Sequence, residues 1–110
     1  MVRKMLVLAA LFSTPAHSQT CSNSDRFNDI VRPYIECSVS RARQLEISKE
    51  TPENISIASL NYCSTGLGPV RAFLSKCFAP EDAEDIVQRV KQTARDVTIS
   101  RIVEGRANVR

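Results

Sequence analysis

Four cysteines, Cys21, Cys37, Cys63 and Cys77, place the strongest constraint on how this chain of 110 residues can fold. An even number of cysteines in a short exported chain is typical of a disulfide framework. The chain has no CxxC motif and its one histidine is His17, so the sequence predicts neither a thioredoxin-like redox site nor a zinc site. We therefore expect two disulfide bonds, no metal and no cofactor.

The start of the chain has the layout of a secretory signal peptide. Arg3 and Lys4 form a positive beginning, and Met5 to Phe12 is an uninterrupted apolar run. This run is far shorter than the roughly 20 residues that a helix needs to cross a bilayer. The protein is therefore predicted to be periplasmic or secreted.

Small residues at Ala16 and Ser18 follow a helix-breaking proline, Pro15. They predict a signal peptide over residues 1–18 with cleavage after Ser18; cleavage after Ala16 is the alternative. Residues 19–110 then form a single small domain. Loss of Arg3 and Lys4 lowers the formal net charge from +3 to +1. A nearly neutral domain attracts nucleic acid and anionic lipid weakly, so we expect no nucleic-acid partner and no stable membrane insertion after cleavage.

Helical periodicity covers most of the remaining chain. Apolar residues recur at steps of three and four over residues 25–47 and again over 53–78. The turn between these segments ends in Thr51 and Pro52, a cap residue followed by a proline in the first helical position. The second apolar stripe consists of Ile57, Leu60, Cys63, Leu67, Val70, Leu74 and Cys77.

The two predicted helices separate the three possible cysteine pairings. In an antiparallel hairpin, facing residues share one midpoint in the sequence. The pairs Cys37–Cys63 and Cys21–Cys77 have midpoints at residues 50 and 49, which lie in the predicted turn. Pairing neighbours along one helix would join cysteines about 20 Å apart, whereas a disulfide needs Cα atoms within about 7 Å. The sequence therefore predicts a nested pairing, Cys37–Cys63 inside Cys21–Cys77.

Each predicted helix contains one break. Pro33 interrupts the first, and Gly66-Leu67-Gly68-Pro69 interrupts the second. Because Pro33 and Leu67 also share the midpoint of the hairpin, the breaks should face each other. We hypothesise a shallow groove at that level, lined by Ile30, Tyr34, Leu67 and Val70.

A third helix is predicted to begin near Pro80, where four acidic residues suit the positive end of a helix. Gly105 is expected to end it, and residues 106–110 are expected to fray. Ile99, Ile102 and Val103 depart from its apolar stripe and either wrap the hairpin or stay exposed for a partner. The predicted fold class is all-α: a disulfide-clamped antiparallel helical hairpin with a third helix packed across it, three or four helices in all.

The residue types left after these assignments offer little catalytic chemistry. Once His17 is removed with the signal peptide and the cysteines are paired, no histidine or free thiol remains for Ser-His-Asp or Cys-His catalysis. A carboxylate hydrolase would need two convergent acids, and the candidates already fit a helix start: Glu81, Asp82, Glu84 and Asp85. We therefore expect no enzyme and no catalytic residues.

Two functions remain open on the sequence alone. The first is non-enzymatic binding of another protein, as in an inhibitor, immunity factor, chaperone or assembly accessory. Its predicted binding surface is Ile99, Ile102, Val103, Arg41 and Arg43. The second is a small helical carrier that holds a lipid or other hydrophobic ligand in the hairpin groove. A closed apolar cavity would favour the carrier, and an exposed apolar patch would favour the binder.

Overall fold

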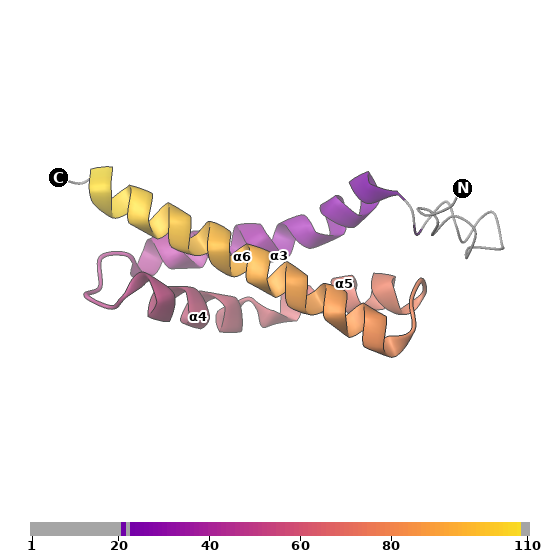
Figure 1. Ribbon diagram of the computed structural model, residues 1–110. Helices are drawn as coiled ribbons and strands as arrows, with labels where there is room; N and C mark the ends of the chain where they lie inside the picture. The colour runs from indigo at the N-terminus through magenta and orange to yellow at the C-terminus, as the bar shows by residue number, and fades with distance from the viewer. Residues whose placement is uncertain (1–20, 22, 109–110) are drawn as a thin grey trace.

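The structure is a computed structural model that describes Cys21 and residues 23–108, and the regular structure in that part is entirely helical (Figure 1). This confirms the predicted all-α fold class. The predicted signal peptide, residues 1–18, lies outside the described residues. The elements in chain order are α3 (Ser24–Leu45), α4 (Pro52–Tyr62), a short 3-10 helix η1 (Ser64–Gly66), α5 (Leu67–Ser75) and α6 (Pro80–Asn108).

The helices form an elongated bundle of 54 × 24 × 20 Å. Helices α4 and α5 run back along α3, and α6 crosses over both arms of this hairpin and packs against α3, α4 and α5 (Figure 1). With 29 residues, α6 spans most of the length of the bundle. The predicted arrangement of a hairpin with a third helix across it is confirmed.

Both predicted disulfides are present. Cys21 pairs with Cys77 and Cys37 pairs with Cys63, with Cα–Cα distances of 5.6 and 5.9 Å. The outer bond ties the start of α3 to the chain just after α5, and the inner bond joins the middle of α3 to the end of α4. Thr51 caps α4, since its hydroxyl accepts a hydrogen bond from the amide of Asn54 at 3.1 Å. The two disulfides thus fix the hairpin at two levels, and Thr51 sets where its second arm begins.

The predicted breaks do lie opposite each other, but the groove between them is filled. Helix α3 continues through Pro33, and a Cβ atom on Gly66 would lie 3.2 Å from the Cα atom of Tyr34. Tyr34, Leu67 and Val70 are buried members of the main hydrophobic cluster. The hypothesis of a groove at this level is therefore wrong, because glycine lets the two chains approach until side chains close the space.

This close approach gives a matched pair of glycine substitutions. Gly66→Ala is expected to lower the free energy of unfolding by about 1–3 kcal/mol, because its Cβ meets the backbone of Tyr34. Gly68→Ala should instead raise stability by up to about 1 kcal/mol, since no atom lies within 4 Å of its Cβ and alanine favours the helix. Urea unfolding followed by circular dichroism measures both. Equal effects of the two substitutions would contradict the close packing at Gly66.

The core consists of two apolar clusters. The larger surrounds Tyr34, Val70 and Leu74, and the smaller joins Ala42, Ile55 and Ile102 near the α3–α4 turn. Four small polar side chains are also fully buried: Ser38, Ser56, Ser59 and Thr98. Their small volume lets the helix backbones approach closely.

The end of α6 differs from the prediction. Gly105 does not end the helix, which continues to Asn108, so the expected fraying from residue 106 is wrong for residues 106–108. Arg106 donates hydrogen bonds to the carbonyl oxygens of Ser48 and Glu50, both at 2.9 Å, and a longer one to that of Glu46. These bonds anchor the end of α6 to the α3–α4 turn.

Candidate binding surfaces

The three apolar residues predicted to form a binding surface on α6 have different environments. Ile102 is 1% exposed and packs against Ala42 and Ile55, so its assignment to a binding surface is wrong. Val103 is 51% exposed, and Ile99 is partly buried. The α3–α4 turn folds against this part of α6 and covers one face of the helix. Only Ile99 and Val103 remain accessible from the predicted set on α6.

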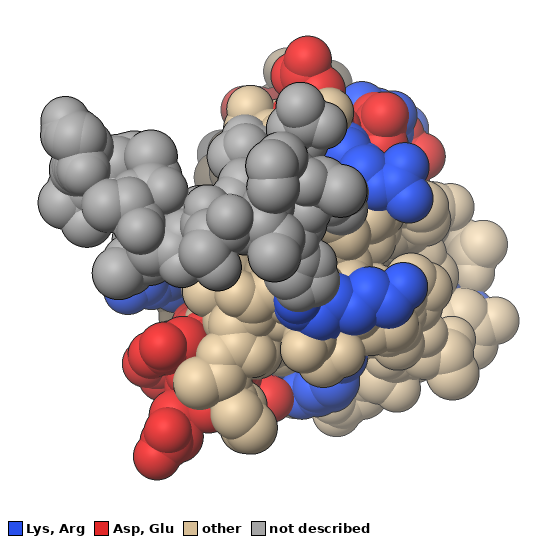
Figure 2. Space-filling model, turned by 90° about the vertical axis from the view of Figure 1, so that its right-hand side faces the viewer, with Lys and Arg blue, Asp and Glu red and all other residues tan. Residues whose placement is uncertain are grey.

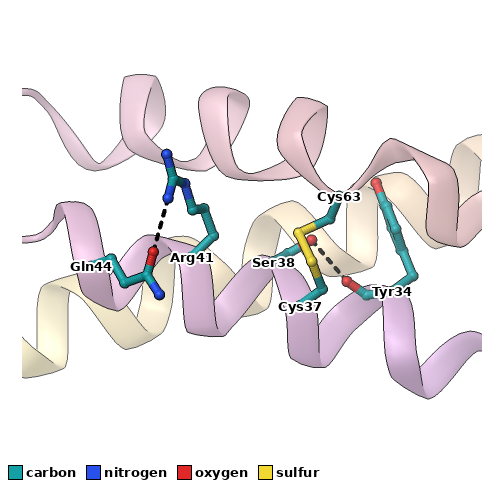
Figure 3. Close-up of a disulfide and its surroundings, with 6 residues drawn as sticks. All are labelled: Tyr34, Cys37, Ser38, Arg41, Gln44 and Cys63. Atoms are coloured by element: carbon teal, nitrogen blue, oxygen red, sulfur yellow. Dashed lines mark hydrogen bonds between the residues drawn. A yellow bond between two sulfur atoms is a disulfide. The ribbon is translucent and has the colours of Figure 1, made fainter.

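Arg41 stacks on an exposed aromatic ring beside the inner disulfide. Its guanidinium carbon lies 4.1 Å from the ring centroid of Tyr62, and its Nη1 donates to Oε1 of Gln44 at 2.9 Å. Figure 3 shows Arg41 reaching from α3 toward α4, one turn along the helix from the Cys37–Cys63 bond. A cation over a tyrosine face is a favourable contact. Arg41 is therefore already engaged within the hairpin.

Arg43 faces a different side of α3, because residues two apart on a helix do not share a face. Together with Arg101 it borders two adjoining hollows between α3 and α6, of about 670 and 350 Å³. Acidic residues border them as well: Glu36, Glu46 and Glu104. The predicted arginines thus do not form one site, and the groove that contains Arg43 has mixed charge.

A further groove lies between α4 and α6 on another side of the bundle. Its hollow has a volume of about 250 Å³ and is lined by Ile57, Leu60, Asn61, Gln88, Lys91, Gln92 and Arg95. Ile57 was predicted to lie on the buried stripe, but it is 48% exposed, and Ile55 fills the core in its place. The hollow combines two apolar residues, three amides and two cations, with no acid among its lining residues.

The accessible residues predicted on α6 continue this groove. Arg95, Ile99 and Val103 follow one another at intervals of four residues, which places them along one face of the helix. Ile99 and Val103 therefore lie one and two turns beyond Arg95, on the α6 side of the groove. We call Ile57, Leu60, Lys91, Arg95, Ile99 and Val103 the α4–α6 face.

All three phenylalanines of the described residues gather at one end of the bundle. Phe27, Phe73 and Phe78 line a hollow of about 200 Å³ with Ile86 and Cys21, and the rings of Phe27 and Phe73 lie 5.9 Å apart. Figure 2 views this end of the molecule, where blue and red side chains are both present beside a broad uncharged area. This hollow is below the 300–1,000 Å³ typical of small-molecule sites.

The acidic start of α6 is organised by contacts within the fold. Glu84 accepts a hydrogen bond from Arg71 on α5 at 3.1 Å and another from Gln88 at 2.8 Å. These bonds lower the pKa of Glu84, with a smaller contribution from the nearby charges of Arg71 and Lys91. A general acid needs the opposite shift. The contacts of Glu84 therefore join α5 to α6 and do not prepare this carboxyl for acid catalysis.

Comparison with known proteins yields no relative: no family model, no curated protein and no solved structure matches this chain. Within the described residues, no helix combines the length and apolar character needed to span a membrane. In the same part of the chain, no three cysteine, aspartate, glutamate or histidine residues are placed so that they could hold a metal ion together. The candidate surfaces must therefore be compared on their own geometry.

Proposed function

We propose that this protein acts by non-enzymatic binding to another protein, in the periplasm or outside the cell. The observation that carries the proposal is the exposure of Ile57 and Val103, about half of each side chain, along the α4–α6 face. Apolar side chains that the core does not use, set beside a concave and partly polar groove, are typical of protein-binding surfaces.

The scaffold supports this role. Two disulfides and the anchoring of the α3–α4 turn by Arg106 hold α3, α4 and α6 in fixed positions. A surface that is already ordered loses little conformational entropy when a partner binds. The disulfides are also typical of an oxidising compartment, which agrees with the predicted signal peptide.

The test begins with expression of the full chain, residues 1–110, so that its own N-terminal segment directs export. Mass spectrometry should find the exported protein without residues 1–18 and with both disulfides formed. The oxidised protein is then immobilised and exposed to extract from the source organism, and bound proteins are identified. We expect one saturable partner that is retained by the wild type and reduced about tenfold or more by Ile57→Ser with Val103→Ser.

The control for capture is Ile47→Ser, which changes an isoleucine that is 91% exposed in the α3–α4 turn and is not one of the residues of the α4–α6 face. Capture that depends equally on Ile47, or no saturable capture, would contradict the proposal. The carrier function predicts a different result. An apolar small molecule would then accompany the exported protein through purification, and a Phe78→Ser substitution would release it.

A further inference from the structure

We infer that the α4–α6 face docks a segment of the partner protein in which an apolar residue is flanked by carboxylates. The inference rests on the proposed function and adds the chemistry of the partner. It is carried by the juxtaposition of an apolar strip with two basic side chains, Lys91 and Arg95, between the same two helices.

The apolar part of the face provides the anchor. Ile57 and Leu60 come from α4, and Ile99 and Val103 continue the strip along α6. Ile57 and Val103 are each about half exposed, so a partner side chain would remove further apolar area of both from water. Burial of apolar area contributes about 25 cal/mol per Å². This strip supplies affinity but does not by itself select a partner.

The basic part supplies the selection. Lys91 and Arg95 line the hollow without an acid among the lining residues, and among the described residues neither forms an ion pair. Two acids of α6 bond to the amides that line the hollow: Glu84 accepts from Gln88 and from Arg71, and Asp96 accepts from Gln92 at 2.9 Å. A partner carboxylate would therefore meet two cations that form no ion pair, in a hollow with no acid among its lining residues.

The α3–α6 groove offers an internal comparison. It also has two arginines, Arg43 and Arg101, and an apolar side at Ile35, Val39 and Val97. There, however, Glu36, Glu46 and Glu104 border the same hollows. Of these hollows beside α6, the one between α4 and α6 is therefore the one whose lining suits an acidic segment.

A protein segment fits this face better than an anionic membrane does. The cations sit in a concave hollow between two helices, with apolar residues and amides beside them. A lipid surface requires a broad basic face, because attraction to anionic lipids grows by about 1 kcal/mol per basic residue near the surface. Two cations in a hollow suit one or two carboxylates of a docked chain.

The test uses a random-peptide library displayed on phage and panned against the oxidised protein. Enriched peptides should contain leucine, isoleucine or phenylalanine flanked by aspartate or glutamate. Lys91→Glu with Arg95→Glu should weaken their binding about tenfold or more, and added salt should weaken binding to the wild type. The matched control is Arg43→Glu with Arg101→Glu, which makes the same charge change on the α3–α6 side and should alter binding less than about twofold.

The Lys91→Glu/Arg95→Glu protein could lose binding because it is misfolded. Peptides of reversed charge distinguish this from loss of charge complementarity. Peptides with lysine in place of each acid should bind the Lys91→Glu/Arg95→Glu protein better than the wild type. The inference is overturned if no peptide is enriched, if enriched peptides lack acids, or if both double variants bind them equally. A membrane partner would give a different result: no peptide is enriched, and the wild type binds vesicles with 30 mol% phosphatidylglycerol while the Lys91→Glu/Arg95→Glu protein does not. That result would overturn the inference. If a partner is captured from extract but the peptide test fails, only the inference about an acidic segment is overturned. The proposed protein-binding function then still stands.

Discussion

Replacing Cys37 and Cys63 together by alanine is expected to lower the free energy of unfolding by about 3–4 kcal/mol. The bond spans 26 residues, and closing a loop of that size restricts the unfolded chain by about this amount in the loop-entropy model. Cys63 is buried in the main apolar cluster, so alanine also leaves a small cavity there. Small domains have total stabilities of about 5–15 kcal/mol, so the loss is a large share.

Guanidinium unfolding of the oxidised proteins, followed by circular dichroism, measures this loss. The comparison variant replaces Cys21 and Cys77, which are both only partly buried, so it tests chain entropy with less disturbance of packing. The outer bond spans 56 residues, so the loop-entropy model alone gives its removal a loss of about 4 kcal/mol, slightly more than for the inner bond. The cavity at Cys63 adds to the loss in the inner-bond variant, so we expect the two variants to be similarly destabilised. An inner-bond variant within about 1 kcal/mol of the wild type would show that helix packing alone holds the middle of the hairpin.

The hairpin could be predicted because its signals are local and geometric. Helical periodicity gave two segments, Thr51 and Pro52 marked the turn, and only one cysteine pairing suits an antiparallel pair centred there. A disulfide requires a short Cα–Cα distance, so four positions in the sequence were enough to set the register. The structure confirms this register at both bonds.

The faces of α6 were harder to predict because a polar residue occupies a core position. The buried stripe runs through Val87, Val90, Ala94, Thr98 and Ile102 at steps of three and four. The neighbouring Val97 is more apolar than Thr98, so the sequence suggested a stripe that turns away before Ile102. Burial of a small threonine depends on how closely the helices approach, which the sequence alone does not show.

The candidate site could be predicted only in part. The sequence singled out Ile99 and Val103, which belong to the α4–α6 face, but not Ile57, Lys91 or Arg95. Which helix lies beside α6 at these positions is set by how α6 crosses the hairpin, and residues far apart in the sequence meet there. The clearest missed signal was the contrast between Ile55 and Ile57, which lie on different faces of α4, so that one face packed in the core leaves the other isoleucine half-exposed.

Tyr34→Ala is expected to lower the free energy of unfolding by about 3–5 kcal/mol, the range for removing a large aromatic side chain from a core. Tyr34 is 1% exposed, packs in the main cluster, and lies against Gly66 where the two chains come closest. Figure 3 shows its ring rising from α3 toward the chain beside Cys63. Because the backbones of α3 and Gly66 are already in contact, they cannot move closer to fill the cavity that alanine leaves at position 34. Denaturant unfolding measures the effect, and a loss below about 1 kcal/mol would contradict it.

Tyr34→Phe is the matched control, because it keeps the ring and removes the hydroxyl. Burial raises the pKa of Tyr34 above its ordinary value of 10.0, and the charge of Arg71 opposes this shift with a smaller effect. Since the folded state holds this proton more tightly than the unfolded state, the associated stability is fully present below pH 10.0 and is lost as the pH rises through the folded-state pKa. Unfolding curves between pH 8 and pH 11 should therefore fall more steeply for the wild type than for Tyr34→Phe. Parallel pH profiles would show that the hydroxyl of Tyr34 ionises in the folded protein without a cost from burial.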